Sequence, residues 1–267
     1  MRPCASAGKL GEEEADNKSM NTIYILWLRQ LKRYFRSKAR LVGSLGQPIL
    51  FLVALGFGFG PIYAKAGGGN YIEFLAPGII AMGILFTAVF SGIEVIWDRQ
   101  FGFLKETMVA PVSRFNIMIG RTLGGATVAA LQGIIVLLIS LIAGFRPVNW
   151  LLVPALFLVM LLVALLFTAL GTAIASNLED MQGFQLIMNF LVMPLFFLSG
   201  ALFPLQGLPA AIEVVAKADP LSYGIDSFRW LLVGTAHFSL GLDILVLTAV
   251  TFILLVIGSF FFSRIQI

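Results

Sequence analysis

Charge and cysteine are both scarce in this sequence. Charged residues occupy 12% of the 267 positions, whereas soluble domains average about 25%. The single cysteine, Cys4, excludes an internal disulfide and any Cys-x-x-Cys metal or redox site. What remains is strongly apolar, with 59% hydrophobic residues and a mean hydropathy of +0.95. Together these values exclude an ordinary soluble domain and predict a membrane protein.

Common catalytic motifs are missing as well. The sequence has no G-x-x-x-x-G-K-[ST] motif, so the chain lacks that phosphate-binding loop and cannot hydrolyse ATP by that route. Neither H-E-x-x-H nor G-x-S-x-G occurs, and we expect the one histidine, His237, to be solvated or hydrogen-bonded rather than a ligand or a base. We therefore expect this chain to be no enzyme by itself and to bind no metal or cofactor.

Six segments contain no charged residue and are each at least 20 residues long: 41–64, 74–93, 122–145, 147–178, 181–212 and 244–263. About 20 helical residues cross a hydrocarbon core of about 30 Å. The two longest segments exceed one crossing, so we place their spans near 150–175 and 183–203. The pattern predicts an all-α polytopic membrane protein with six transmembrane helices in one domain over 41–267.

The chain before the first span divides into two parts. Residues 1–19 are small, polar and acidic, which predicts a disordered tail and no cleavable signal peptide. Residues 20–40 have two helical faces, and such a helix is expected to lie at the membrane surface with its cations on anionic lipid. A basic nucleic-acid patch is the alternative, which the following span disfavours. Trp27 is on the aromatic face, and the basic face includes Arg29, Lys32, Arg33 and Arg36.

The cations also predict the orientation. Fourteen of the 18 Lys and Arg residues fall on one side of the predicted spans. Because positive charge is retained inside, we expect both termini and the connection over 94–114 to be cytoplasmic, in a cell (inner) membrane. The net charge of +4 is then explained by topology, and no nucleic-acid partner is needed.

The connection over 94–114 is unusually rich in charge for so apolar a chain. Read as a helix, residues 99–109 place Phe101, Leu104 and Met108 on one face. Pro111 is expected to end this helix. The alternative is a solvated loop that only fixes topology. Arg99, Lys105 and Glu106 fall outside the apolar face.

The segment over 204–237 is broken by prolines into two short helices, near 208–218 and 220–234. Asp219 is expected to cap the second helix, with Pro220 at its first position. Asp226 and Arg229 are three residues apart and can pair. From periodicity alone, an ordinary external loop and a re-entrant hairpin fit equally well.

Three smaller features carry predictions. Asp180 is expected to cap the fifth span. The repeats at Gly56–Gly60 and Gly120–Gly124 have the small-xxx-small spacing that lets membrane helices approach closely. We expect the first of these spans to lie at a dimer interface.

Two stretches resemble the type-2 ABC (ATP-binding cassette) exporter permeases. The connection matches their cytoplasmic coupling loop at Glu94, Arg99, Gly102, Leu104, Val109, Pro111, Ser113 and Arg114. The segment before the last span is similar to their re-entrant hairpin at Pro220, Leu221, Ser222, Tyr223, Asp226, Phe228, Arg229 and Gly234. The order of the parts over 20–267 is also similar.

The resemblance implies a membrane subunit of an ATP-driven exporter, working as two copies with two separate ABC-type ATPase subunits that bind ATP and Mg²⁺. The coupling helix would sit in a cleft of the ATPase, filled by Phe101, Leu104 and Met108, with Arg99, Lys105 and Glu106 pairing at the rim. The implied substrate is a lipophilic drug, lipid or lipid-linked glycan, and the short external loops favour a drug-resistance-like permease. Rival classes are an ATP-independent carrier, a channel and a membrane-embedded enzyme. The span centres contain no Asp, Glu, Lys or Arg, which argues against an ion-driven carrier.

Overall fold

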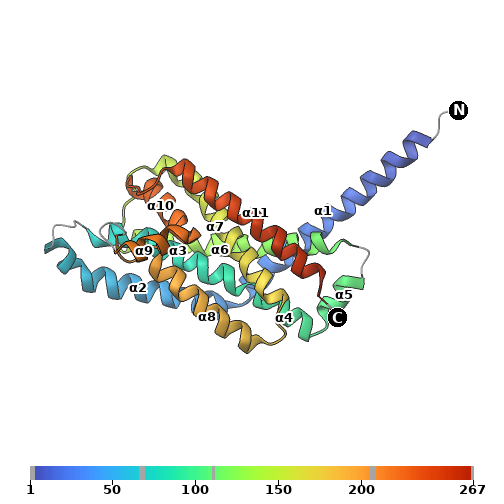
Figure 1. Ribbon diagram of the computed structural model, residues 1–267, viewed down its shortest axis with the longest axis horizontal. Coiled ribbons are helices and arrows are strands. Elements are labelled where there is room, and N and C mark those ends of the chain that lie inside the picture. The colour runs from blue at the N-terminus through green and yellow to red at the C-terminus, as the bar shows by residue number, and fades with distance from the viewer. Residues whose placement is uncertain (1–3, 66–69, 110–111, 205–208, 266–267) are drawn as a thin grey trace.

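The computed structural model describes residues 4–65, 70–109, 112–204 and 209–265. Within these ranges every regular element is a helix and none is a strand (Figure 1), which confirms the all-α prediction. The elements are α1 (Cys4–Arg36), α2 (Lys38–Lys65), α3 (Tyr71–Phe90), α4 (Ile93–Gln100), α5 (Phe103–Val109), α6 (Arg114–Ile142), the 3₁₀ turn η1 (Trp150–Leu152), α7 (Val153–Ser176), α8 (Met181–Leu198), α9 (Ala210–Ala218), α10 (Pro220–Val233) and α11 (Leu240–Ser263).

Six stretches of the described chain are long and apolar enough to cross a membrane, as predicted. The second stretch runs on through Asp98 and the third begins at Arg114, so both reach further into charged sequence than expected. The physical reason is that Asp98 and Arg121 pair with each other inside the protein. The six stretches are Arg40–Tyr63, Tyr71–Gln100, Arg114–Ile142, Trp150–Ser176, Met181–Leu198 and Leu240–Ser263.

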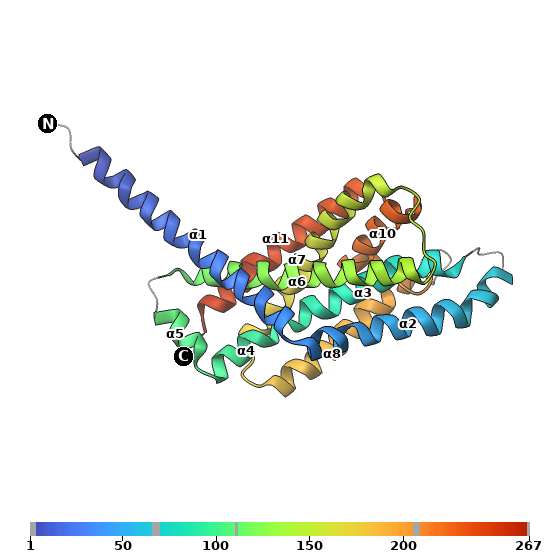
Figure 2. The ribbon, with the colours of Figure 1, turned by 180° about the vertical axis from the view of Figure 1, so that it is seen from behind.

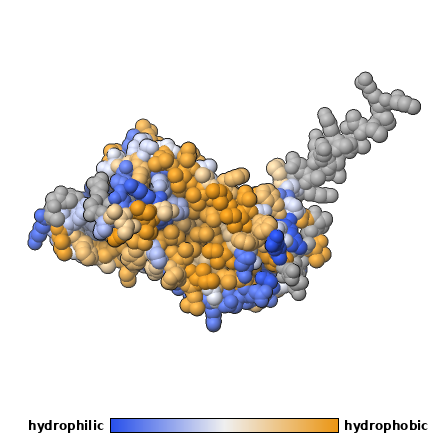
Figure 3. Space-filling view, viewed as in Figure 1, coloured by the Kyte–Doolittle hydropathy of each residue, from blue (hydrophilic) through white to orange (hydrophobic). Residues whose placement is uncertain are grey.

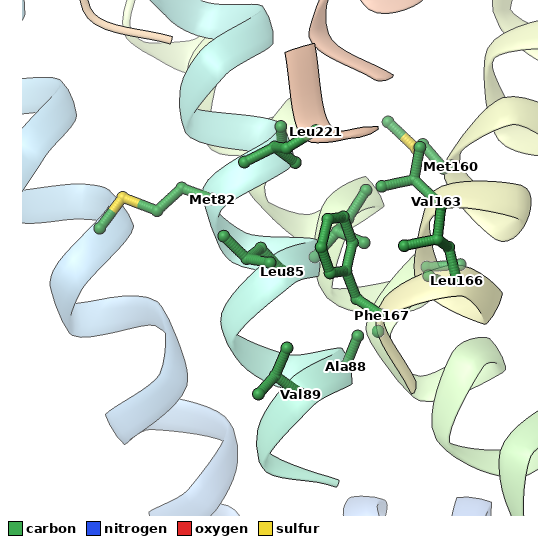
Figure 4. Close-up of a cluster of buried hydrophobic side chains, with 14 of the residues drawn as sticks. Met82, Leu85, Ala88, Val89, Met160, Val163, Leu166, Phe167 and Leu221 are labelled. Carbon is green, nitrogen blue, oxygen red and sulfur yellow. The ribbon is translucent and has the colours of Figure 1, made fainter. Parts of the chain in front are cut away.

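Helix α3 lies at the centre of the bundle, packed against α2, α6, α7 and α10. Its side chains meet those of α7 and the start of α10 in a continuous apolar core (Figure 4). Burial of such side chains contributes roughly 1.5–3 kcal/mol each relative to exposure in water. The labelled residues of this core are Met82, Leu85, Ala88, Val89, Met160, Val163, Leu166, Phe167 and Leu221.

Two glycines bring the backbones of α3 and α7 into contact. A Cβ added at Gly171 would strike the backbone of Val89, and one added at Gly92 would strike the backbone of Gly171. No other residue fits without moving a helix. The crossing therefore fixes the separation of the two central helices.

Helix α1 packs against the second glycine repeat, Gly120–Gly124 on α6. Gly120 faces Ile23 and Leu26, and Gly124 faces Trp27 and Gln30. The second half of α1 consequently lies along the start of α6 (Figure 2), and this close approach confirms the packing prediction for Gly120–Gly124.

The N-terminal segment differs from expectation. Residues 1–19 were predicted to be disordered, but α1 begins at Cys4 and runs unbroken to Arg36, so the predicted interfacial helix is the second half of a longer one. Its first half projects away from the bundle (Figure 1). This half contains three Ala and three Glu, which have high helix propensity, and it extends a helix already fixed on α6.

The outer helices present apolar side chains to their surroundings. Phe57 of α2, Phe190 of α8 and Phe252 of α11 are all exposed, and Figure 3 shows an apolar band across the bundle with hydrophilic residues gathered toward its two ends. Gly58 and Gly60 also face open space. This surface fits lipid or a second copy of the chain, and the predicted dimer interface at the first span stays a prediction.

Candidate functional site

The predicted coupling helix is broken into two helices. Helix α4 ends at Gln100, and α5 starts at Phe103 after a sharp corner at Gly102, whose φ of +79° lies in the region that favours glycine. The single helix expected over 99–109 is therefore wrong. We call the end of the bundle with this corner the α5 end; the C-terminus lies there too, because Arg114 donates to the carbonyl oxygens of Ser263 and Ile265.

The break changes which apolar side chains are available. Phe101 is 80% exposed, whereas Leu104 is completely buried in the core. The two residues do not share a face as predicted, since the glycine corner rotates α5 relative to α4. Val109, at the end of α5, is 86% exposed. The side chain of Met108 lies outside the described residues.

Of the residues predicted to pair at the rim of the ATPase cleft, Arg99 has a partner within this chain. The Arg99 guanidinium donates to Glu179 at 3.0 Å, and the Gln100 amide donates to the Glu179 carbonyl oxygen at 3.0 Å. These bonds join the corner to the connection between α7 and α8. Glu106 is exposed, while the side chain of Lys105 lies outside the described residues.

Two carboxylates of α4 form a charge cluster with arginines from three other helices. Glu94 and Asp98 are only 4% and 5% exposed. Asp98 lies 2.9 Å from Arg29 of α1 and 2.7 Å from Arg121 of α6, and Glu94 lies 2.6 Å from Arg40 of α2. Arg33 of α1 contacts both carboxylates, at 3.6 and 3.9 Å. These six residues, the charge cluster, hold four helices together at the α5 end.

The cluster follows from matched helical spacing. Glu94 and Asp98 are four residues apart, as are Arg29 and Arg33, so each pair shares one face of its helix. Arg29 and Arg33 were predicted to face lipid. They face the carboxylates instead, because leaving a buried carboxylate without a cation costs more free energy than leaving a lipid headgroup without one. Lys32 and Arg36 are exposed, as a lipid-facing role requires. Trp27 is turned inward and donates to Thr127 at 3.0 Å.

Aromatic rings extend the charge cluster to the corner. The Arg29 guanidinium lies 3.7 Å from the centre of the Phe103 ring, at the start of α5. Arg33 and Arg40 lie 5.3 and 5.6 Å from the Trp97 ring. Such cation–π contacts add about 0.5–2 kcal/mol each. Helix α1 is therefore attached to both α4 and α5.

At the opposite end, which we call the α9 end, the two predicted short helices are present as α9 and α10. Asp219 accepts from the Leu221 N–H at 2.8 Å, with Pro220 at the first position of α10. Asp180 likewise caps α8 through Gly183. Both caps confirm their predictions, whereas re-entry of α9 and α10 into a bilayer stays a prediction.

The expected pair of Asp226 and Arg229 is replaced by backbone contacts. The N–H groups of His237 and Phe238 donate to the Asp226 carboxylate at 2.7–3.0 Å. Arg229 donates to the Gly200 carbonyl oxygen at 2.7 Å and lies over the Phe74 ring. Each side chain thus forms hydrogen bonds with backbone groups of a connection outside α10. A spacing of three residues in the sequence cannot reveal these partners.

Burial shifts two pKa values at the α9 end. Burial raises the pKa of Asp219 to about 7, although the Leu221 N–H opposes the shift. Burial also lowers the pKa of Arg229 to about 10, against the attraction of Asp226. Tyr223 joins the same region, since its hydroxyl donates to the Lys217 carbonyl oxygen at 2.8 Å and its ring stacks on Phe238.

The sequence signals that could have located the charge cluster were present but incomplete. Arg40, Asp98 and Arg121 were not among the predicted site residues, although Asp98 follows Glu94 at helical spacing. For Arg121, the sequence showed only that it directly precedes the uncharged segment over 122–145. No group of His, Cys, Asp or Glu among the described residues could hold a metal ion.

Comparison with known proteins agrees with this architecture. Residues 21–233 match the family model described as ABC-2 type transporter, from α1 to the end of α10. The chain is 30% identical over 213 residues to Nodulation protein J of Rhizobium leguminosarum bv. trifolii, covering 79% of this chain and 78% of that protein. It is 32% identical over 215 residues to the putative transport permease ycf38 of Pyropia yezoensis, covering 78% and 73%. This chain therefore belongs to the ABC-2 type transporter permease family.

Proposed function

We propose that the chain is the membrane-spanning subunit of an ATP-driven exporter, and that separate ABC-type ATPase subunits bind ATP and Mg²⁺ and supply the energy. The observation that carries this proposal is the corner at Gly102. It presents Phe101 and Val109 to the surroundings. On either side of it, Arg99 is attached to the connection between α7 and α8, and Phe103 is attached to α1. An exposed aromatic side chain on an anchored corner suits a docking contact.

The attachments suggest how a push on the corner would spread. Displacement of the corner would act on α1 through Phe103 and Arg29, and on the connection between α7 and α8 through Arg99 and Glu179. Asp98 links α4 to α1 and α6 within the same charge cluster. Since helices are stiff, motion of their ends would be carried along the bundle. We infer that the charge cluster keeps α1, α4 and α6 moving together.

Orientation and assembly belong to the same proposal. We place the α5 end in the cytoplasm, with both termini, in a cell (inner) membrane, because ATP is available there and the cations gather on that side. Two copies of the chain would work together, and the exposed faces of α2, α8 and α11 would meet lipid or the second copy.

For the substrate we keep the wider class of a lipophilic drug, lipid or lipid-linked glycan. The names of the two relatives refer to nodulation and to transport, and neither mentions drug resistance. Their names therefore lend no support to the drug-resistance likeness. An ATP-independent carrier or a channel is the alternative, and no observation in the described residues favours it.

The docking role of the corner can be tested by copurification with the ATPase subunit. Phe101→Ala should weaken the complex about tenfold, the loss of about 1.4 kcal/mol expected for an aromatic anchor, and reduce stimulation of ATP hydrolysis. Phe115→Ala is the matched control, because Phe115 is also exposed, at 54%, but lies on α6 beyond the corner. Equal binding and stimulation by the two variants would show that the corner is not the docking site.

The orientation has its own test. In a Cys4→Ser background, Phe101→Cys provides one exposed thiol at the corner. A membrane-impermeant maleimide should label it only after the cells are lysed. Labelling in intact cells would place the α5 end outside and remove the basis for an ATPase partner.

A further inference from the structure

A cavity of about 370 Å³ lies within one copy of the chain, between α1, α2, α3, α4 and α6. Ligand pockets in proteins occupy roughly 300–1,000 Å³. Its floor is apolar and includes Met82, Phe86 and Phe90 of α3; the Met82 side chain points from α3 toward α2 (Figure 4). Its other end is lined by Arg40 and Trp97. The cavity is thus amphipathic along its length.

The polar end of the cavity carries excess positive charge. Trp97 lies near both Arg33 and Arg40, whose side chains are 33% and 35% exposed. Glu94 also lines the cavity, but its carboxylate is already held by Arg40 at 2.6 Å and contacted by Arg33 at 3.6 Å. Four arginines surround two carboxylates in the charge cluster. An anionic group at the mouth would balance this excess.

The depth of the cavity fits a lipid tail. Arg40 begins the first span, so the mouth lies at the membrane boundary. From Phe90 to Met82 the floor extends eight residues along α3, ~12 Å at 1.5 Å per residue. That distance approaches half of a hydrocarbon core of about 30 Å. A soluble anion would leave this apolar floor without a partner.

Polar groups also line the wall contributed by α1 and α2. The Tyr34 hydroxyl donates to Gln132 at 2.5 Å, and Ser44 donates to the same Gln132 oxygen at 3.2 Å. Tyr34, Ser44 and Gln30 all line the cavity. The hydroxyl oxygens and the amide can pair with glycerol or ester groups of a lipid.

We propose that this cavity binds an anionic membrane lipid from the leaflet at the α5 end. One acyl chain lies along Met82, Phe86 and Phe90, and the phosphate lies against Arg40 and Arg33. The lipid joins the mouth of the cavity to the charge cluster, so its binding stabilises the contact between α1, α2 and α4. This site is independent of the ATPase partner and would hold if the exporter proposal failed.

The proposal is tested by photolabelling the purified full chain in lipid nanodiscs. The probe is phosphatidylglycerol with a diazirine on one acyl chain, and phosphatidylcholine with the same chains is the comparison. We expect adducts within residues 82–90, several-fold more abundant for phosphatidylglycerol. Unlabelled phosphatidylglycerol should compete, whereas glycerol phosphate without acyl chains should not.

A matched pair of glycine variants tests the location. Gly43 lines the cavity and has no atom within 4 Å of an added Cβ, so a side chain can begin there freely and Gly43→Leu should extend into the cavity. Gly46 is on the same helix with equally open surroundings but does not line the cavity. Gly43→Leu should lose about tenfold in labelling, equivalent to about 1.4 kcal/mol of binding, while Gly46→Leu should match the unmodified protein.

Charge variants test the headgroup contact. Arg40→Gln should remove most of the preference for phosphatidylglycerol, and Arg40→Lys should restore it, whereas Lys38→Gln, at an exposed position of the same helix, should have no effect. The proposal is overturned if Gly43→Leu labels like Gly46→Leu, if both headgroups label equally, or if glycerol phosphate alone competes.

Discussion

The two ends of the bundle bury carboxylates in opposite ways. At the α5 end Asp98, 5% exposed, is neutralised by arginines from α1 and α6. At the α9 end Asp226, 4% exposed, accepts from the backbone N–H groups of His237 and Phe238, only eleven and twelve residues later in the chain. The first arrangement depends on where whole helices lie, and the second depends only on a local turn.

This difference indicates what each end can do. Ion pairs between separate helices tie the motion of one helix to that of the others, so the charge cluster can transmit displacement. A carboxylate that caps its own loop keeps its partners as the helix moves. We therefore expect substitutions at the α5 end to affect both stability and ATPase coupling, and those at the α9 end to affect stability alone.

The largest effect is expected for Asp98→Ala. The substitution leaves Arg121, whose side chain is 3% exposed, buried without its nearest carboxylate, and breaking a buried pair from one side costs about 3–5 kcal/mol. Thermal unfolding of the purified protein measures this loss. Glu106→Ala removes an exposed carboxylate nearby and should change stability by no more than about 0.5 kcal/mol. Similar unfolding of the two variants would mean that the cluster stabilises nothing.

At the α9 end, Asp226→Ala should cost about 1–3 kcal/mol, because two backbone N–H groups lose their acceptor. The difference from Asp98 should be clearest in function: stimulation of the ATPase subunit should persist at temperatures where the variant is folded. Glu213→Ala, on α9, is the control for general effects at this end. Loss of stimulation in folded Asp226→Ala would break the distinction between the two ends.

A pH dependence should also be confined to the α9 end. The pKa of Asp219 rises from 3.8 to about 7 through burial, so folding favours the protonated form. Its contribution to stability is full below pH 3.8 and is lost as the pH rises through about 7, at no more than about 1.4 kcal/mol per pH unit. Asp219→Asn keeps a capping side chain and should reduce the dependence. If the stability of Asp219→Asn depended on pH as strongly as that of the unmodified protein, another group would be responsible for the dependence.

The smallest effect is expected at the Arg99–Glu179 pair. The Glu179 side chain is 82% exposed, and exposed ion pairs contribute about 0.2–1 kcal/mol. A double-mutant cycle with Arg99→Gln and Glu179→Gln should give a coupling energy in this range from unfolding data. A much larger value would show that this pair belongs with the buried charge cluster rather than with the surface.

Much of the fold follows directly from the sequence. Six uncharged runs predict the six spans, because unpaired charge is costly in hydrocarbon. Asp219, Pro220 and Asp180 predict helix starts from local hydrogen bonding alone. The glycine spacing at Gly120 and Gly124 predicts a close approach, although the partner, α1, could not be deduced from spacing.

The site was harder to predict because its contacts join distant residues. Arg29 and Asp98 are 69 positions apart, and their pairing depends on α1 lying along α6. The positive φ at Gly102 could have been anticipated from glycine in a polar connection, but an uninterrupted helix also fitted the periodicity. Phe101 and Leu104 were therefore assigned to one face, although the corner separates them.

The backbone contact of α3 and α7 at Gly92 and Gly171 has a mechanical consequence. Because the two main chains touch at this point, we expect the helices to change their crossing angle there more easily than they slide past each other. This point lies two residues before Glu94 and six before Asp98, so we expect a small change of angle there to produce a larger displacement at the α9 end. The two glycines would then form a pivot. Because this pivot lies close to the charge cluster, α5 would move a shorter distance than the α9 end.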